Sequence, residues 1–197
     1  MRIGLFGGSF DPPHDGHALV SRIALTRLKL DRLWWVVSPG NPLKDASELP
    51  SIEDRIAAAK KILPDPRVAF TGFEADINAR FTSETIDYLH AHCPGVRFVW
   101  IMGADNLLQF HRWRQWREIA LTTPIAVIDR PGATLKALSA KAAVFFRSAR
   151  LPESAAATLA STPPPAIVYL HGPRLERSST ELREGYLRSK SGSIQRL

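Results

Sequence analysis

The sequence predicts an α/β protein built on a doubly wound parallel sheet with helices on both faces, formed by a single domain. Short apolar segments alternate along the chain with longer segments in which apolar residues recur at helical spacing, and this alternation is typical of parallel sheets. The strand segments are apolar almost without interruption, as at residues 97–102 (RFVWIM), which indicates burial on both faces. The length of 197 residues suits one well-buried core.

The first half of the chain is predicted to contain three strands with helices between them. A helix over residues 15–30 has apolar positions spaced to form one face. Ser51 followed by Asp54 resembles a capping box, so a second helix is expected to begin there and to run to about Leu63. The strands are expected at residues 2–6, 32–37 and 67–71.

The second half continues the pattern. Thr82 or Ser83 is expected to cap a helix that runs to about His92, and one or two helices containing Trp113 and Trp116 follow. Three more strands are expected at residues 96–102, 124–129 and 166–170. Residues 133–165 are rich in Ala, Ser and Pro and show no clear periodicity. A final helix is expected from Ser178. The domain is expected to span residues 1–188, and residues 189–197 are expected to form a frayed basic tail.

Composition places the chain among folded globular proteins of the cytoplasm. Its apolar fraction of 45% argues against disorder, and no apolar segment approaches the roughly 20 residues that span a bilayer. The first residues have too little apolar length for a signal peptide. The single cysteine, Cys93, excludes an internal disulfide framework and fits a reducing compartment.

The net charge of +7 favours an anionic partner, which could be nucleic acid, a membrane surface or a phosphorylated small molecule. A nucleic-acid-binding module would gather basic residues on one face with aromatic residues between them. The basic residues here are dispersed. We therefore expect neither a nucleic-acid partner nor a membrane partner, and a homo-oligomer stays open.

A glycine-rich segment, residues 7–17 (GGSFDPPHDGH), joins the first strand to the first helix. Gly7 and Gly8 let the backbone approach a polyanion closely, and the helix start presents free N–H groups and a positive dipole end. His14 and His17 lie three residues apart, so both rings can face one bound group. Two such histidines alone would suit a polar, solvent-exposed helix start or a partial metal site, but the glycine and strand context favours a phosphate site.

Other polar segments also follow the predicted strands. In a doubly wound sheet, ligands gather at the carboxyl ends of the strands, where residues 38–44, residues 103–105 and Arg130 are expected. Near the end of the chain, RSSTELR (residues 177–183) offers hydroxyl groups at a helix start. Those hydroxyls can cap the helix and bind phosphate at once, and Arg183 adds a planar guanidinium that suits phosphate.

These motifs resemble one known family. HDGH (residues 14–17) resembles the HxGH signature of the nucleotidyltransferases, RSSTELR matches their SSTxxR pattern, and the whole sequence is similar to bacterial nicotinate-nucleotide adenylyltransferases. GADN (103–106), RWRQW (112–116) and DRPG (129–132) resemble the same family. The resemblance implies a Rossmann-like enzyme of NAD biosynthesis that transfers AMP from ATP to nicotinate mononucleotide and releases pyrophosphate.

The expected chemistry needs no general base, because the attacking phosphate is already ionised at neutral pH. The protein has to align the two substrates and neutralise charge on the phosphoryl oxygens. His14, His17 and Arg183 are therefore the expected catalytic residues. The expected ATP-binding residues are Gly7, Gly8, Ser9, Phe10, His17, Gly103, Asp105, Ser178, Ser179, Thr180 and Arg183. Mg²⁺ is expected as a cofactor that ATP carries on its phosphates, without a dedicated protein site.

For the second substrate, the resemblance implies that Trp113 stacks on the pyridine ring and that Thr85 helps to read its carboxylate. Lys44 and Arg130 are expected to attract the phosphate of the mononucleotide. The sequence departs from the family at Leu43, where a histidine usually precedes the loop lysine.

Three other functions would use some of the same features. Transfer to phosphopantetheine or to glycerol phosphate would use the same HxGH loop, but the RWRQW and GADN segments favour the nicotinate enzyme. A fragment of a class I aminoacyl-tRNA synthetase would need a KMSKS-like element and an anticodon domain, which the sequence does not offer. A nucleic-acid-binding module is the alternative from another functional class.

Overall fold

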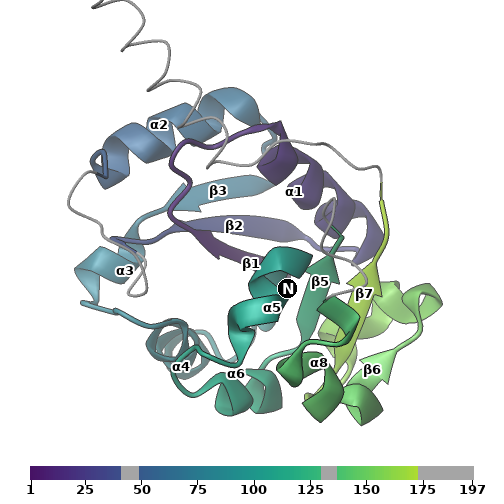
Figure 1. Ribbon diagram of the computed structural model, residues 1–197. Helices are drawn as coiled ribbons and strands as arrows, with labels where there is room; N and C mark the ends of the chain where they lie inside the picture. Colours follow the sequence, from purple (N-terminus) through teal and green to yellow (C-terminus); the bar gives the residue numbers. More distant parts are fainter. Residues whose placement is uncertain (41–48, 130–136, 173–197) are drawn as a thin grey trace, which may run out of the picture.

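The computed structural model describes residues 1–40, 49–129 and 137–172 (Figure 1). Within these residues the chain forms one seven-stranded sheet with the strand order β3-β2-β1-β4-β5-β7-β6, and every recorded strand pair is parallel. The predicted α/β fold with a doubly wound parallel sheet is therefore confirmed. The strands are β1 Arg2–Gly8, β2 Arg32–Val37, β3 Val68–Thr71, β4 Arg97–Gly103, β5 Ile125–Ile128, β6 Arg150–Leu151 and β7 Ile167–Leu170.

The order of the strands places a switch point beside β1. The chain moves outward from β1 through β2 to β3, and then returns across the sheet to lay β4 along the other side of β1. In an open parallel sheet the loops at such a point diverge at the carboxyl ends of the strands and leave room for a ligand. The loop that follows β1 therefore occupies the position where this fold usually binds its substrates.

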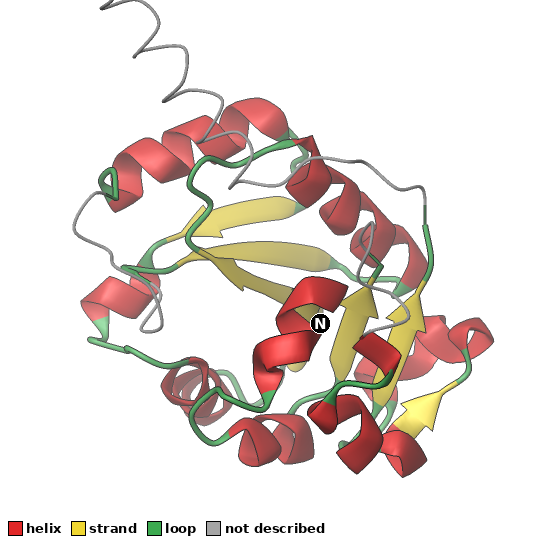
Figure 2. Cartoon of the chain, viewed as in Figure 1, coloured by secondary structure: helices red, strands yellow, loops and turns green. Residues whose placement is uncertain are grey.

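Helices cover both faces of the sheet, as Figure 2 shows. One face packs against α1 and α2 and a 3₁₀ helix that precedes β7; the other packs against α4, α5, α6 and α8. Each face buries its own apolar cluster, which explains why the strands are apolar at nearly every position. The helices are α1 Asp15–Arg27, α2 Ile52–Ile62, α3 Phe73–Asp76, α4 Thr82–His92, α5 Ala104–Phe110, α6 Trp116–Thr122, α8 Lys141–Phe145 and the 3₁₀ helices Arg147–Ala149 and Glu153–Ser161.

Several predicted boundaries were wrong. The first helix ends at Arg27 instead of continuing to residue 30, and Lys29 then takes a left-handed conformation with φ of 52°. The predicted caps of α4, Thr82 and Ser83, lie inside the helix. Its N-cap is Phe81, whose amide donates to the Glu84 carboxylate (3.2 Å). The Glu84 side chain thus makes the bond to the N-cap amide that completes one half of a capping box.

The region of weak prediction, residues 133–165, contains α8, two 3₁₀ helices and the short edge strand β6 within its described part. The helix α3 was not predicted either. Its four residues are too few to display a helical repeat. The helix expected from Ser178, the domain boundary at residue 188 and the tail at residues 189–197 lie outside the described residues and stay predictions.

Candidate active site

The strand β1 ends in two glycines, and at the first of them, Gly7, the sheet leaves no room for a side chain. A Cβ atom on Gly7 would lie 2.6 Å from the indole ring of Trp100, a contact that no real Cβ makes. Phe10 then turns the chain with a positive φ of 47° and stacks its buried ring on Trp35, with ring centroids 4.5 Å apart. Any contact between Phe10 and ATP would therefore use its backbone.

His14 and His17 start α1, and the structure brings their rings together. His14 is the N-cap, and its Nδ1 accepts a hydrogen bond from the Gly16 amide (3.0 Å). His17 Nδ1 accepts from the His14 amide (3.2 Å), and the ring centroids lie 3.8 Å apart. The side chains replace the Ser and Glu of a capping box with two imidazoles.

These two bonds fix the protons on both rings. Because each Nδ1 accepts from a backbone N–H, it carries no proton, and a neutral ring must then carry its proton on Nε2. Both residues are largely buried, with exposed fractions of 3% for His14 and 9% for His17. The start of α1 thus holds two imidazoles oriented so that Nε2–H is the donor of each.

Buried side chains of α1 and β2 hold the first turn of α1, which carries the histidine pair. The Ser21 hydroxyl donates to the carbonyl oxygen of His17 (2.9 Å), and the Trp35 indole donates to the Ser21 oxygen (2.7 Å). Trp35 also supports Phe10 through the stacked contact. One buried tryptophan of β2 therefore supports both the loop and the first turn of α1.

On the other face of the sheet, Thr85 lies in α4 with no exposed surface. Its hydroxyl donates to the Glu74 carboxyl group (2.6 Å). Burial raises the pKa of Glu74, and the hydrogen bond from Thr85 partly opposes that rise. The single hydroxyl proton of Thr85 is thus engaged with Glu74, and in this arrangement it is not available to a ligand carboxylate.

Three buried polar atoms were not predicted from the sequence. Within the described part of the chain, the Ser83 hydroxyl, the Trp100 indole nitrogen and His111 Nδ1 have no hydrogen-bond partner. Such atoms are rare in native proteins and call for an explanation. Ser83 was identified only as a possible cap, and no spacing in the sequence marks its hydroxyl as a buried group.

The two tryptophans of the RWRQW segment have different surroundings. Trp116 opens α6 and is buried against Phe146, so it packs the core. Trp113 lies in the turn between α5 and α6, against Trp100 and Phe110, and is half-buried. Trp113 was predicted to lie in a helix, and this was wrong, because it falls between the end of α5 and the start of α6.

An ion pair connects the turn of Trp113 to the start of α4. Arg114 donates to the Glu84 carboxylate (3.1 Å) and places its guanidinium 4.9 Å from the centre of the Phe81 ring. Glu84 in turn accepts from the backbone amides before α4. The structure therefore brings together the segments that carry two predicted residues, Thr85 and Trp113.

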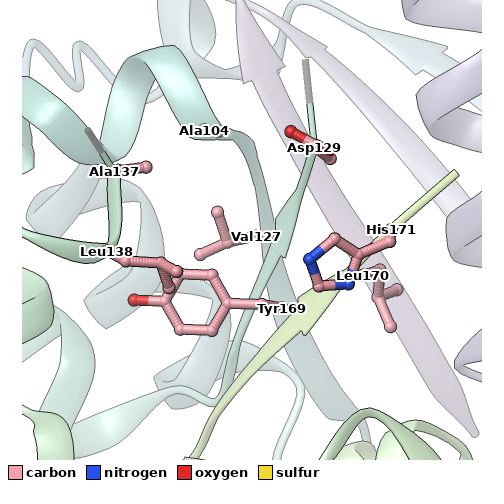
Figure 3. Close-up of a pocket in the computed structure, with 8 residues that line it drawn as sticks. All are labelled: Ala104, Val127, Asp129, Ala137, Leu138, Tyr169, Leu170 and His171. Atoms are coloured by element: carbon pink, nitrogen blue, oxygen red, sulfur yellow. The ribbon is translucent and has the colours of Figure 1, made fainter. Parts of the chain in front are cut away.

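Gly103 ends β4 and is the N-cap of α5, and Asp105 is exposed in the first turn of that helix. Beside them lies a small pocket at the carboxyl ends of β5 and β7 (Figure 3). Tyr169 and Asp129 line the pocket, and burial raises the pKa of Tyr169. His171 also lines it and is held by Glu153, whose carboxylate lies 2.8 Å from His171 Nδ1.

The remaining predicted site residues lie outside the described residues. They are Lys44, Arg130, Ser178, Ser179, Thr180 and Arg183. Of the predicted residues that are described, Gly7, Gly8, Ser9, His14 and His17 share one loop and helix start. No group of three or more His, Cys, Asp or Glu side chains in the described ranges is arranged to hold a metal ion, and no helix in those ranges is long and apolar enough to span a bilayer.

Comparison with known proteins agrees with the geometry. Residues 5–185 match the cytidylyltransferase-like family. The chain is 57% identical to a probable nicotinate-nucleotide adenylyltransferase of Agrobacterium fabrum, over 94% of this chain and all of that protein. It is also 57% identical to the protein of that name from Methylorubrum extorquens, over 93% of this chain and 99% of that protein.

Among solved structures, the fold is similar to the nicotinic acid mononucleotide adenylyltransferase of Plasmodium falciparum complexed with NaAD. The TM-score is 0.69 at 16% identity, over 93% of this chain and 82% of that chain, which shows a shared fold. The sequence relatives are close enough to show more. The chain belongs to the cytidylyltransferase-like family and, within it, to the nicotinate-nucleotide adenylyltransferases.

Proposed function

We propose that this chain transfers the AMP group of ATP to nicotinate mononucleotide. A phosphate oxygen of the mononucleotide forms a bond to the α-phosphorus of ATP, the bond from that phosphorus to the bridging oxygen breaks, and pyrophosphate leaves. The product is nicotinate adenine dinucleotide. The observation that carries the proposal is the histidine pair, because both rings are held with Nε2–H as the donor at the start of α1.

The histidine pair suits a reaction that needs charge stabilisation more than proton transfer. His14 and His17 would donate from Nε2 to phosphoryl oxygens, whose charge shifts as the α-phosphorus is transferred. Their Nδ1 atoms are occupied by backbone amides, so the rings need not reorganise. Buried donors with fixed directions are worth more in the transition state than mobile ones in water.

The rest of the ATP site follows from the ends of β1 and β4. Gly7, Gly8 and Ser9 would lie along the phosphates, since glycine lets the backbone approach them closely. Gly103 and Asp105 at the start of α5 would contact the nucleoside. Ser178, Ser179, Thr180 and Arg183 would close over the β- and γ-phosphates, with hydroxyls at a helix start and a guanidinium fork.

The mononucleotide site lies on the opposite face, between α4 and the turn of Trp113. Trp113 has a partly exposed ring on which a pyridine could stack. Ser83 offers a buried hydroxyl that has no partner among the described residues and could donate to the ring carboxylate, beside the backbone of Thr85. Lys44 and Arg130 would supply positive charge for the mononucleotide phosphate.

We also propose Mg²⁺ as the ion that accompanies ATP. Magnesium prefers phosphate oxygens and keeps several of its waters, so it needs no all-protein cage. When bound, the ion would neutralise charge on the phosphates. The chain's own contribution is to hold those phosphates at the start of α1.

The test is a panel of acceptors in which pyrophosphate release and dinucleotide formation are measured together. We expect nicotinate mononucleotide with ATP to give both products in equal amounts, and nicotinamide mononucleotide to react more slowly, because an amide cannot accept every donor that a carboxylate does. Turnover with phosphopantetheine or glycerol phosphate, and none with nicotinate mononucleotide, would reject the proposal in favour of another acceptor.

A further inference from the structure

Arg55 is a buried arginine whose guanidinium contacts only backbone carbonyls in the recorded hydrogen bonds. It lies in α2 and exposes 3% of its surface. Its Nη1 donates to the carbonyl oxygens of Ser9 (2.7 Å) and Ser38 (2.8 Å), and its Nε donates to that of Pro50 (3.0 Å). A buried guanidinium is costly unless its donors are satisfied, so these bonds are a built feature of the fold.

The two carbonyls on Nη1 occupy equivalent positions at the edge of the sheet. Gly8 of β1 pairs with Val37 of β2 as the last pair in their ladder. Ser9 and Ser38 are the next residues on each strand, where the two chains begin to diverge. Ser38 N–H still donates to the carbonyl of Gly8 (3.0 Å), and Arg55 then joins the two strands at the point where their own pairing stops.

The start of α2 fixes the guanidinium in this place. Ser51 caps the helix by accepting from the Asp54 amide (3.0 Å). Side chains on a helix lean toward its N-terminus, which directs Arg55 back over Pro50 and the sheet edge. Burial lowers the pKa of Arg55, but an arginine stays charged in proteins, so its donors are permanent.

We propose that Arg55 is a positioning residue for adenylyl transfer. It holds the backbone of the histidine loop at Ser9 against the end of β2, and so sets where His14 and His17 meet the α-phosphorus. The inference rests on the proposed function. It predicts that loss of Arg55 affects turnover more than substrate binding, because a displacement of about 1 Å at a reacting centre costs about 100-fold in rate.

The experiment measures kcat and KM for ATP and for nicotinate mononucleotide in Arg55→Lys, Arg55→Gln and Arg55→Ala, alongside thermal unfolding. We expect kcat to fall about 10-fold in the lysine variant, whose single nitrogen cannot occupy the positions of both Nη1 and Nε, and about 100-fold in the other two, with both KM values within about threefold. Millimolar guanidinium ion should restore part of the turnover of Arg55→Ala without changing that of the wild type.

Arg32→Gln is the matched control. Arg32 also donates to a backbone carbonyl, that of Pro66 (2.6 Å), but it is exposed and lies at the opposite end of β2. Its loss should leave kcat and KM within about twofold of the wild type, as for most surface substitutions. An equal fall in kcat for Arg32→Gln would show a general effect of stability and overturn the proposal.

Three further results would overturn the positioning role of Arg55. They are wild-type kcat in folded Arg55→Gln, a rise in KM with unchanged kcat, and failure of all three variants to fold. Failure of the proposed function is a different result, since the wild type itself would then form no dinucleotide from ATP and nicotinate mononucleotide.

Discussion

The two sides of the proposed site are built differently. On the α1 side, the polar groups of His14 and His17 are already held by backbone bonds, and Arg55 and Trp35 support the loop from beneath. On the α4 side, the buried polar atoms of Ser83, Trp100 and His111 have no hydrogen bond among the described residues that would fix their direction.

This difference indicates that the α1 side serves phosphoryl transfer and that the α4 side serves recognition of the mononucleotide ring. Transfer of a phosphoryl group rewards donors that are fixed before the reaction. Recognition of a ring rewards donors that are left for the ligand to satisfy, because a wrong ligand then leaves them unpaired. We therefore expect substitutions on the α1 side to lower kcat and substitutions on the α4 side to raise KM for the mononucleotide.

The largest effect is expected for His17→Ala. Loss of one fixed donor should lower kcat about 100- to 1000-fold, while the dissociation constant for ATP, measured by calorimetry, changes much less. His92→Ala is the control, because His92 is an exposed imidazole stacked on Tyr88 at the far end of α4. Unchanged turnover in His17→Ala would contradict the assigned role.

The next largest effect is expected for Trp113→Ala on the other side. Loss of the stacking surface should raise KM for nicotinate mononucleotide about tenfold and leave KM for ATP unchanged. In Trp113→Phe, KM for the mononucleotide should lie between the values of the wild type and Trp113→Ala. Tyr88→Ala removes an exposed aromatic ring from α4 and serves as the control. A fall in kcat at unchanged KM for the mononucleotide would contradict a role of Trp113 in binding.

Ser83→Ala should have opposite effects on binding and on stability. Removal of a buried hydroxyl without a partner should leave the free energy of unfolding unchanged or raise it, whereas the lost bond to substrate should raise KM for the mononucleotide about fivefold. In Ser161→Ala, which removes the acceptor of a bond from Arg97, KM should stay constant. A loss of stability in Ser83→Ala with constant KM would mean that the hydroxyl serves the fold.

The smallest effect concerns pH and Glu74. Folding raises the pKa of this carboxyl group by burial, so the charged form is disfavoured in the native state. The stabilising contribution of the protonated form is complete below the ordinary pKa of glutamate and is lost as pH rises through the raised value. The melting temperature of the wild type should therefore fall relative to that of Glu74→Gln as pH increases over this range, and parallel curves would contradict the burial argument.

Local patterns predicted the features that depend on neighbouring residues. The alternation of strands and helices gave the parallel sheet, and the glycines and histidines of residues 7–17 gave a loop and helix start with both rings together. Burial on both faces makes strands such as β4 easy to identify. The start of α4 was predicted at the wrong residue, because Phe81 is capped through Glu84 and not by its own side chain.

Contacts between distant residues could not be predicted in the same way. The bond from Thr85 to Glu74 crosses from α4 to α3, and Arg55 reaches Ser9 from another helix. No spacing in the sequence encodes such pairs, because the fold sets their distance. Lys44, Arg130 and the segment from Ser178 to Arg183 lie outside the described residues and stay predictions.

The most direct measurement follows the α-phosphorus itself. ATP labelled with ³²P at that atom is incubated with nicotinate mononucleotide and either the wild type or His17→Ala, and the products are separated. The account predicts that the wild type moves all reacted label into the dinucleotide and none into pyrophosphate, and that the variant does so at least about 100-fold more slowly. Label in free AMP without dinucleotide, or an equal rate in the variant, would contradict it.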